Sequence, residues 1–277
     1  AGLFVSKVGT AVVTSRMLVD GTLPQKYSKL LGRGVDVENG AQVTLLDVRL
    51  SGNRLAGLFV SGMGTGLVAN RLLIDETLSQ ESDLEQGWGV DVQNGAQTTL
   101  QDARLSANQD VGLLVSGSGT KLSANRLLVD GTLAQQVDQT GGNGVITQFG
   151  AQITLQNARL SGNRKVGLAS DGVGSGLAGN CILVDATLPQ QSNMRYGRGA
   201  HAQFDAVMTL QAAQFVGNRD AGLVAVASSL RLVGGTIQAT VPDQIDNLGG
   251  QAVWLFSGTE ASIVASARTG GLYAVNT

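Results

Sequence analysis

The sequence predicts an all-β solenoid, a right-handed parallel β-helix of about ten turns, and three observations support this prediction. Similar phrases return along the chain, short apolar stretches alternate with polar residues, and the composition is rich in glycine and poor in charge. Gly accounts for 39 of 277 residues and charged residues for 14%, whereas average proteins have roughly 7% Gly and roughly 25% charged residues. Hydrophobic residues make up 43% of the chain, enough for a large core, and we interpret residues 1–277 as a single domain.

The repeat is marked by five glycines, each followed by an apolar pair or near-pair, at a constant interval of 57 − 2 = 55: Gly2, Gly57, Gly112, Gly167 and Gly222. A fixed period of this kind is typical of stacked repeats. Two further phrases, one ending in Asp and one in Asn, divide each interval into steps of 53 − 20 = 33 and 75 − 53 = 22. We therefore expect each repeat unit to form two similar turns, a short one and a long one (22 + 33), with one ladder of short polar side chains: Asp20, Asn53, Asp75, Asn108, Asp130, Asn163, Asp185 and Asn218.

Each turn reads as short strands separated by bends. The shorter turn is "GLLVSGSGTKLSANRLLVD" (112–130) and the core of the longer one is "GVDVQNGAQTTLQDARLSAN" (89–108). Apolar residues alternate over four to six positions between Gly, Ser and Asn, which indicates strands and not helices. Three strands per turn, stacked at ~4.8 Å, would give a rod roughly 48 Å long.

The phrase "GVDVENGAQVTLLDVRLSGNR" (34–54) and its copies resemble the parallel β-helix repeat superfamily, whose best-known members are the pectate lyases. The resemblance covers essentially the whole chain, and the Asn that ends each "LSGN" phrase resembles the stacked asparagine ladder of that superfamily. It implies the fold but little about function, because the superfamily includes enzymes, adhesins and scaffolds. The phrase "LQDARLSAN" also fits a leucine-rich repeat, but the following "QDVGLLVSGSGT" is too rich in Gly and β-branched residues for the helix that such a repeat requires.

The polar ladder has a structural interpretation. Asp and Asn at tight bends bond neighbouring backbone groups and tolerate left-handed conformations. Its carboxylates would lie two turns apart, roughly 9.6 Å, too far to share one ion. We therefore expect neither a metal site nor a cofactor.

Six arginines stand four residues before the members of this ladder: Arg16, Arg49, Arg71, Arg104, Arg126 and Arg159. Their neighbours are apolar, so strand alternation turns the guanidinium groups outward. In a single row they would repel one another unless counter-charges lie beside them. Asp47 and Asp102, two residues before Arg49 and Arg104, are candidate partners. Unpaired, the row would suit an anionic polysaccharide. The row ends at Cys181, which we expect to be outward and free.

Each longer turn carries an extra loop, namely 24–33, 79–88, 134–143 and 189–198, with formal charges of +3, −3, −1 and +2. These loops hold Tyr27, Trp88 and Tyr196. Two interpretations remain open. The loops form a recognition face whose aromatic residues bind a sugar or a partner, or they pack along the rod with opposite charges meeting between neighbours.

Several function classes are disfavoured. A net charge of −2 gives no general attraction to nucleic acid, one Cys and one His exclude disulfide frameworks and paired-His zinc motifs, and no apolar stretch is long enough for a membrane helix. Asp36 and Asp91 lie outward in "GVDV", but Ile146 and His201 follow in that register, and we interpret His201 as a tolerated surface variant. No residue is assigned a catalytic role.

The hypothesis is therefore a non-enzymatic bacterial scaffold, secreted or at the cell surface, which acts as an adhesin-like or filament-forming rod. The compartment follows from the resemblance and is consistent with the absence of a cysteine pair. No cap is visible at Ala1, and "GLYAV" (271–275) reads as the start of another turn, which suggests a longer chain, end-to-end self-association or a larger surface assembly. The alternative is a polysaccharide-binding or polysaccharide-cleaving protein, a lyase or a glycoside hydrolase if it is an enzyme.

Overall fold

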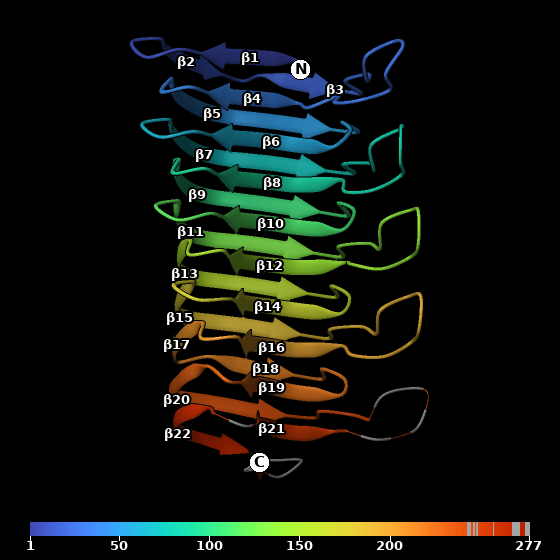
Figure 1. The fold of residues 1–277 in the computed structure, drawn as a ribbon, viewed down its shortest axis with the longest axis vertical. Helices are drawn as coiled ribbons and strands as arrows, with labels where there is room; N and C mark the ends of the chain where they lie inside the picture. The colour runs from blue at the N-terminus through green and yellow to red at the C-terminus, as the bar shows by residue number, and fades with distance from the viewer. Residues whose placement is uncertain (243–244, 246, 248, 257, 268–271, 275–277) are drawn as a thin grey trace.

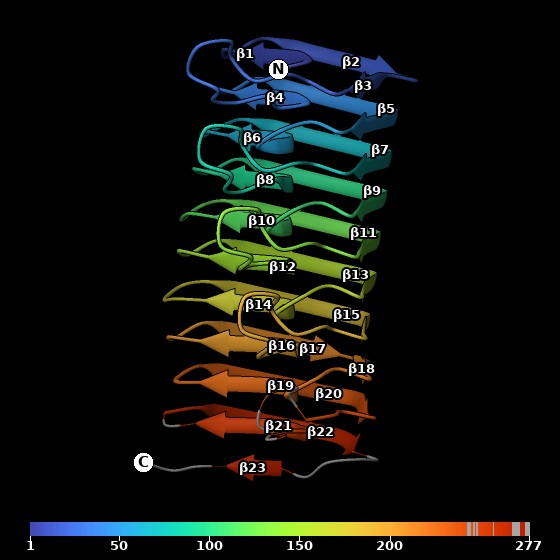
Figure 2. The ribbon, with the colours of Figure 1, turned by 90° about the vertical axis from the view of Figure 1, so that its right-hand side faces the viewer.

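The computed structural model describes residues 1–277 except 243–244, 246, 248, 257, 268–271 and 275–277. The described part of the chain forms strands and turns and contains no helix. The strands stack coil upon coil into a rod, with β1 at one end and β22 and β23 at the other (Figures 1 and 2). The chain is therefore a parallel β-helix, as the repeat pattern predicts.

The first sheet takes one strand from each coil. Its strands, in spatial order, are β1 (Leu3–Ser6), β4 (Val35–Glu38), β6 (Ala56–Ser61), β8 (Trp88–Gln93), β10 (Val111–Ser116), β12 (Asn143–Gln148), β14 (Val166–Asp171), β16 (Arg198–Gln203), β19 (Ala221–Val226), β21 (Gln251–Phe256) and β23 (Leu272–Ala274). All of these neighbours pair in parallel. In β23, three residues of the predicted further turn extend this sheet, whereas residues 271 and 275 lie outside the described residues.

The second sheet runs along the opposite side of the rod (Figure 2). Its strands, in chain order, are β2 (Ala11–Ser15), β3 (Leu18–Asp20), β5 (Gln42–Ser51), β7 (Gly66–Asp75), β9 (Gln97–Ser106), β11 (Lys121–Asp130), β13 (Gln152–Ser161), β15 (Gly176–Asp185), β17 (Val207–Gln211), β18 (Gln214–Val216), β20 (Ser229–Gln238) and β22 (Glu260–Ala267). Because β2 shares a coil with β3, and β17 shares one with β18, the twelve strands make 12 − 2 = 10 coils, and β23 of the first sheet begins an eleventh.

Each long strand of the second sheet bends near its middle. The sixth residue of β7, Arg71, has φ 56°, and the sixth residues of β5, β9 and β11 have φ 55°. A left-handed residue turns the strand, so one long strand supplies two of the three sides of a coil. This accounts for the three short strands per turn that the sequence predicts.

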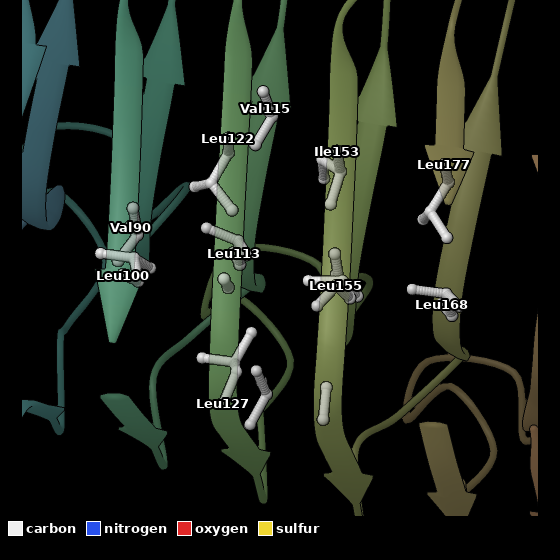
Figure 3. Close-up of a cluster of buried hydrophobic side chains, with 14 of the residues drawn as sticks. Val90, Leu100, Leu113, Val115, Leu122, Leu127, Ile153, Leu155, Leu168 and Leu177 are labelled. Carbon is white, nitrogen blue, oxygen red and sulfur yellow. The ribbon is translucent and has the colours of Figure 1, made fainter. Parts of the chain in front are cut away.

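The core runs inside the rod between the two sheets. In one coil, Leu113 and Val115 from β10 meet Leu122 and Leu127 from β11, and all four are almost fully buried. Figure 3 shows the same stacking repeated in neighbouring coils. Each fully buried side chain of this size contributes about 1.5–3 kcal/mol, and parallel pairing aligns like residues from coil to coil, so burial and backbone pairing support the same register.

Strand pairing divides the 55-residue repeat slightly differently from the steps of 33 and 22 between the Asp and Asn phrases. In the second sheet Val43 pairs with Leu67, a step of 67 − 43 = 24, and Leu67 pairs with Thr98, a step of 98 − 67 = 31. The physical reason is that the Asp and Asn phrases end at different places. Asp75 is the last residue of its strand and pairs with Ser51, whereas Asn53 lies two residues beyond Ser51, inside the corner.

Candidate functional site

The six arginines do not form one row. Arg71 lies at a bend opposite Asp47, because their neighbours Asn70 and Leu46 pair. Arg49 lies two residues beyond Asp47 on the same strand and pairs with Leu73. The bend column therefore alternates in charge along the rod, in the order Arg16, Asp47, Arg71, Asp102, Arg126, Asn157 and Cys181. The second column contains Arg49, Arg104 and Arg159, separated by leucines.

Five of these arginines form bidentate ion pairs with aspartates on an adjacent coil. Arg104 donates from Nε and Nη2 to Asp130 at 3.0 and 2.9 Å, and the Nη2–Oδ2 distance of the Arg49–Asp75 pair is 2.7 Å. The other pairs are Arg71–Asp47, Arg126–Asp102 and Arg159–Asp185. Asp47 and Asp102 are therefore counter-charges of the arginines, as expected, but they pair with Arg71 and Arg126 and not with Arg49 and Arg104. The reason is that each arginine side chain reaches a carboxylate on the adjacent coil.

The hydrogen bond from Arg71 lowers the pKa of the Asp47 carboxyl group, and the hydrogen bond to Asp130 raises the pKa of Arg104. Each guanidinium group is more than half exposed, so each pair contributes little to stability by itself. The main effect is that charges which would repel along the rod are neutralised. Cys181 is exposed and free, as predicted.

The expected Asp/Asn ladder also separates into two columns. The aspartates end strands on the outside, where three of them pair with arginines. The asparagines lie inside the corner and alternate along the rod with threonines, so that Asn108 lies between Thr77 and Thr132. The Oδ1 atom of Asn163 accepts hydrogen bonds from the backbone N and Oγ1 of Thr132 at 3.0 and 2.6 Å, and its Nδ2 donates to a backbone carbonyl group.

These asparagines therefore satisfy polar groups that the corner would otherwise bury without partners. The threonines were not predicted, although they recur with the period of the repeat in the phrases "DGTL", "DETL" and "DATL".

The four long loops stand out along one corner of the rod (Figure 1). Neighbouring loops contact one another, since Lys29 pairs with Glu81 at 2.9 Å and the backbone N of Gln136 donates to the carbonyl oxygen of Leu84. Opposite charges therefore meet between the first two loops, as one of the two interpretations expected, whereas the second and third loops meet through backbone hydrogen bonds.

The aromatic residues of the loops differ in exposure. Tyr27 is 90% exposed. Trp88 is partly buried and its indole N–H donates to Asp110 Oδ2 at 2.9 Å, while the guanidinium carbon of Arg198 lies 5.0 Å from the ring centre of Tyr196. The three residues lie on different loops and do not form one aromatic cluster.

The outer face of the first sheet holds polar groups that its neighbours cover. Asp91 is 1% exposed, lies between Phe59 and Leu114 on adjacent strands, and neither carboxylate oxygen has a hydrogen-bond partner. Burial raises its pKa to about 7. Asp36 is also buried, and its Oδ2 atom accepts a hydrogen bond from Nη1 of Arg33 at 2.8 Å. The guanidinium carbon of Arg33 lies 3.4 Å from the ring centre of Phe59. Both aspartates point away from the core, as predicted, yet neither is at the surface.

His201 is partly buried and lines a hollow, so it is less exposed than its interpretation as a surface variant expected. Its Nε2 atom is buried without a partner, and burial lowers the pKa of the imidazole to about 3, with smaller effects from Arg198 and Lys165. The residue lines a hollow of about 430 Å³ with Lys165, Tyr196, Gln203 and further residues. Neighbouring residues of the fold therefore cover part of a side chain whose position looks like a variable surface position in the sequence.

A second concavity, of about 510 Å³, crosses the outer face of the second sheet between Ala11 and Thr154. Its lining is uncharged except for Lys121. In the described part of the chain no three His, Cys, Asp or Glu side chains are grouped so that they could bind a metal ion, and the same part holds no helix that could span a membrane.

Comparison with known proteins identifies no family. No family model matches the chain, and no curated protein matches it. Among solved structures, the Agl-KA catalytic domain is matched over 96% of this chain and 53% of its own length, with 9% identity and a TM-score of 0.32. A hyper-glycosylated TibA fragment, modified by TibC, is matched over 99% and 98%, with 13% identity and a TM-score of 0.17. The chain spans about half of the first of these structures, and both likenesses are too weak to indicate a function.

Proposed function

We propose that the protein is a rigid, non-enzymatic β-helical scaffold that acts outside the cytoplasm, as an adhesin-like module or a filament segment. The observation that carries this proposal is the continuity of the rod. Parallel pairing runs from β1 to β23, and the same buried columns extend along the described coils. A structure held by backbone pairing along its whole length resists bending without any single indispensable contact.

The exterior supports the same proposal. Five ion pairs neutralise the charges along one side, and the long loops bond to one another at a corner. Membership of the superfamily typified by pectate lyases, as a member that lacks enzymatic activity, is part of this proposal. The alternative, an anionic polysaccharide held by the arginine row, has less support because five of the six arginines already bind carboxylates.

The first test asks whether the protein is displayed on the outside of the cell. Cys181 is exposed and is the one cysteine of the sequence, so a membrane-impermeant maleimide should label it on intact cells that produce the protein. Cys181→Ser is the matched control and should remain unlabelled. Labelling that appears only after the cells are broken would contradict an extracytoplasmic location.

The second test concerns the rod. Electron microscopy of the purified chain should show stiff particles, since eleven strands in the first sheet span about 48 Å at ~4.8 Å per step. A concentration series distinguishes the two forms of the scaffold. Particles that lengthen with concentration indicate a filament segment, whereas particles of constant length indicate a module within a larger surface protein. Flexible or collapsed particles would contradict a rigid scaffold.

A further inference from the structure

A groove lies on the outer face of the first sheet, across β12 to β21. Two adjoining hollows, of about 430 and 210 Å³, share the lining residues Lys165, Val166, His201 and Gln203. Because they share these residues, they form one continuous depression. The repeat is broken at this place in two ways, and each break contributes to the groove.

The first break is the charge at Lys165. One repeat earlier and one repeat later the same position holds Asp110 and Asp220, each of which accepts a hydrogen bond from an indole or guanidinium group on the preceding coil, at 2.9 and 2.7 Å. In the middle repeat Asn143 stands at the position of the donor on the preceding coil, and the ammonium group of Lys165 replaces the carboxylate acceptor. Among the described residues Lys165 forms no ion pair with a carboxylate. The groove therefore holds a cation that forms no direct ion pair.

The second break is the small side chain of Ala169. The equivalent positions of the other repeats hold larger residues, Phe59, Leu114 and Val224. Ala169 pairs with Ile146 on one side and with His201 on the other. A methyl group between two larger side chains leaves a hollow, which is where the smaller part of the groove lies.

The remaining lining residues offer flat and apolar surface together with amide groups. Val224, Val226 and Phe256 line one half of the groove, with the ring of Tyr196 beside them. Gln148 and Gln203 add amides. The lining therefore suits a ligand with a flat body that also carries polar groups.

The charges of the groove are few. Arg198 pairs with Asp220 at 2.7 Å, so its charge is already balanced. The carboxylate of Asp171 lines only the smaller hollow. Burial keeps the His201 imidazole neutral at pH 7, because its pKa is lowered to about 3. Lys165, which lines both hollows, is thus the cation of the groove that forms no ion pair among the described residues, and the carboxylate that interacts with its charge is that of Asp110.

We propose that this groove binds a small carboxylate ligand with a flat body about one ring in size. The ammonium group of Lys165 pairs with the carboxylate, and the valines, Phe256 and the Gln203 amide contact the body. The proposal does not depend on the scaffold function, because it concerns a local departure from the repeat and not the rod.

Two kinds of ligand share this chemistry, a sugar acid and an aromatic acid, and they can be separated with probes. Sodium glucuronate and sodium benzoate represent the two kinds, and glucose and benzyl alcohol are the matched neutral compounds. His201 is the one histidine of the sequence, so full-length protein labelled in histidine gives a single set of imidazole signals that reports from within the groove. Each probe is titrated while this signal is followed by nuclear magnetic resonance.

We expect at least one of the two carboxylates to shift the imidazole signals saturably, and its neutral counterpart to shift them at least tenfold more weakly. Lys165→Gln should weaken binding at least tenfold. Ala169→Leu fills the hollow with the side chain that Leu114 places there one repeat earlier, and should also weaken binding at least tenfold. Lys121→Gln, on the other sheet, is the control and should bind as the wild type does.

A shift with glucuronate alone assigns the groove to sugar acids, a shift with benzoate alone assigns it to aromatic acids, and shifts with both assign it to carboxylates in general. The proposal is overturned if neither carboxylate shifts the signals, or if Lys165→Gln binds as tightly as the Lys121→Gln control.

Discussion

The buried carboxyl group of Asp91 predicts a specific pH dependence of stability. In the folded protein its pKa is raised to about 7 by burial, against 3.8 for the free side chain. Folding therefore favours the protonated form. The stability that protonation supplies is fully present below pH 3.8, and it is lost as the pH rises towards 7, because the unfolded chain then ionises while the folded chain must either retain a proton or bury a charge.

The size of the effect follows from the two pKa values. Their difference is 7 − 3.8 = 3.2, and each pKa unit corresponds to about 1.36 kcal/mol, so the loss at pH 8 is about 4 kcal/mol. Asp91 is 1% exposed and neither carboxylate oxygen has a hydrogen-bond partner, so solvent screening reduces this value little. Such a loss is a large fraction of the stability of an ordinary domain.

The assay is urea unfolding followed by circular dichroism between pH 4 and 8. Asp91→Asn removes the titration. Asp91→Ile also removes the buried polar group, and Ile146 shows that the equivalent position one repeat later accepts isoleucine. Relative to the wild type, both variants should gain about 4 kcal/mol in free energy of unfolding between pH 4 and pH 8.

Asp205→Asn, at an exposed position, is the control and should follow the wild type at every pH. The reasoning is refuted if the wild type and Asp91→Asn show the same dependence of unfolding free energy on pH, because the carboxyl group would then be ionised without cost in the folded protein.

Three further predictions concern the buried asparagines of the corner, a glycine that packs against the adjacent coil, and the exterior ion pairs. Asn163→Ala leaves the backbone N–H of Thr132 without its buried acceptor and should lower the free energy of unfolding by about 2–4 kcal/mol, and an unchanged urea midpoint would contradict this. Gly112→Ala places a methyl group against the Val129 side chain and 2.8 Å from the carbonyl oxygen of Gly144, so it should cost about 1–3 kcal/mol or more, measured as a fall in Tm. For Arg104 and Asp130 a double-mutant cycle should give a coupling below about 1 kcal/mol that shrinks in about 1 M salt, and a larger, salt-independent coupling would show that the exterior pairs hold the rod together.

Much of the fold could be predicted because a repeat protein presents the same local pattern many times. Glycines at a constant interval and apolar alternation, as in "GLLV" and "RLLVD", identify stacked strands without any long-range information. The outward direction of Arg71 and of Cys181 also follows from the pattern around them. Both are exposed in the structure.

The register between the two kinds of turn could not be predicted in this way. Asp75 and Asn53 look equivalent, since each closes a phrase of alternating apolar residues, yet Asp75 ends a strand whereas Asn53 lies inside the corner. A shift of two residues keeps the inward and outward faces unchanged, because side chains alternate with a period of two. Hydrophobic pattern alone therefore does not distinguish the two registers.

The sequence by itself determined that the chain is a β solenoid, which faces of its strands are apolar, and where loops leave the repeat, because these properties are local and repeated. Only the tertiary structure decided which residues of neighbouring coils meet. It paired Arg49 with Asp75 and not with Asp47, buried Asp91 and partly buried His201, and placed Ala169 beside Lys165 in a groove. The physical reason is that charge, burial and cavity depth depend on neighbours one coil away, which are distant along the chain, as the pairs Val35–Leu58 (58 − 35 = 23) and Ala56–Trp88 (88 − 56 = 32) illustrate.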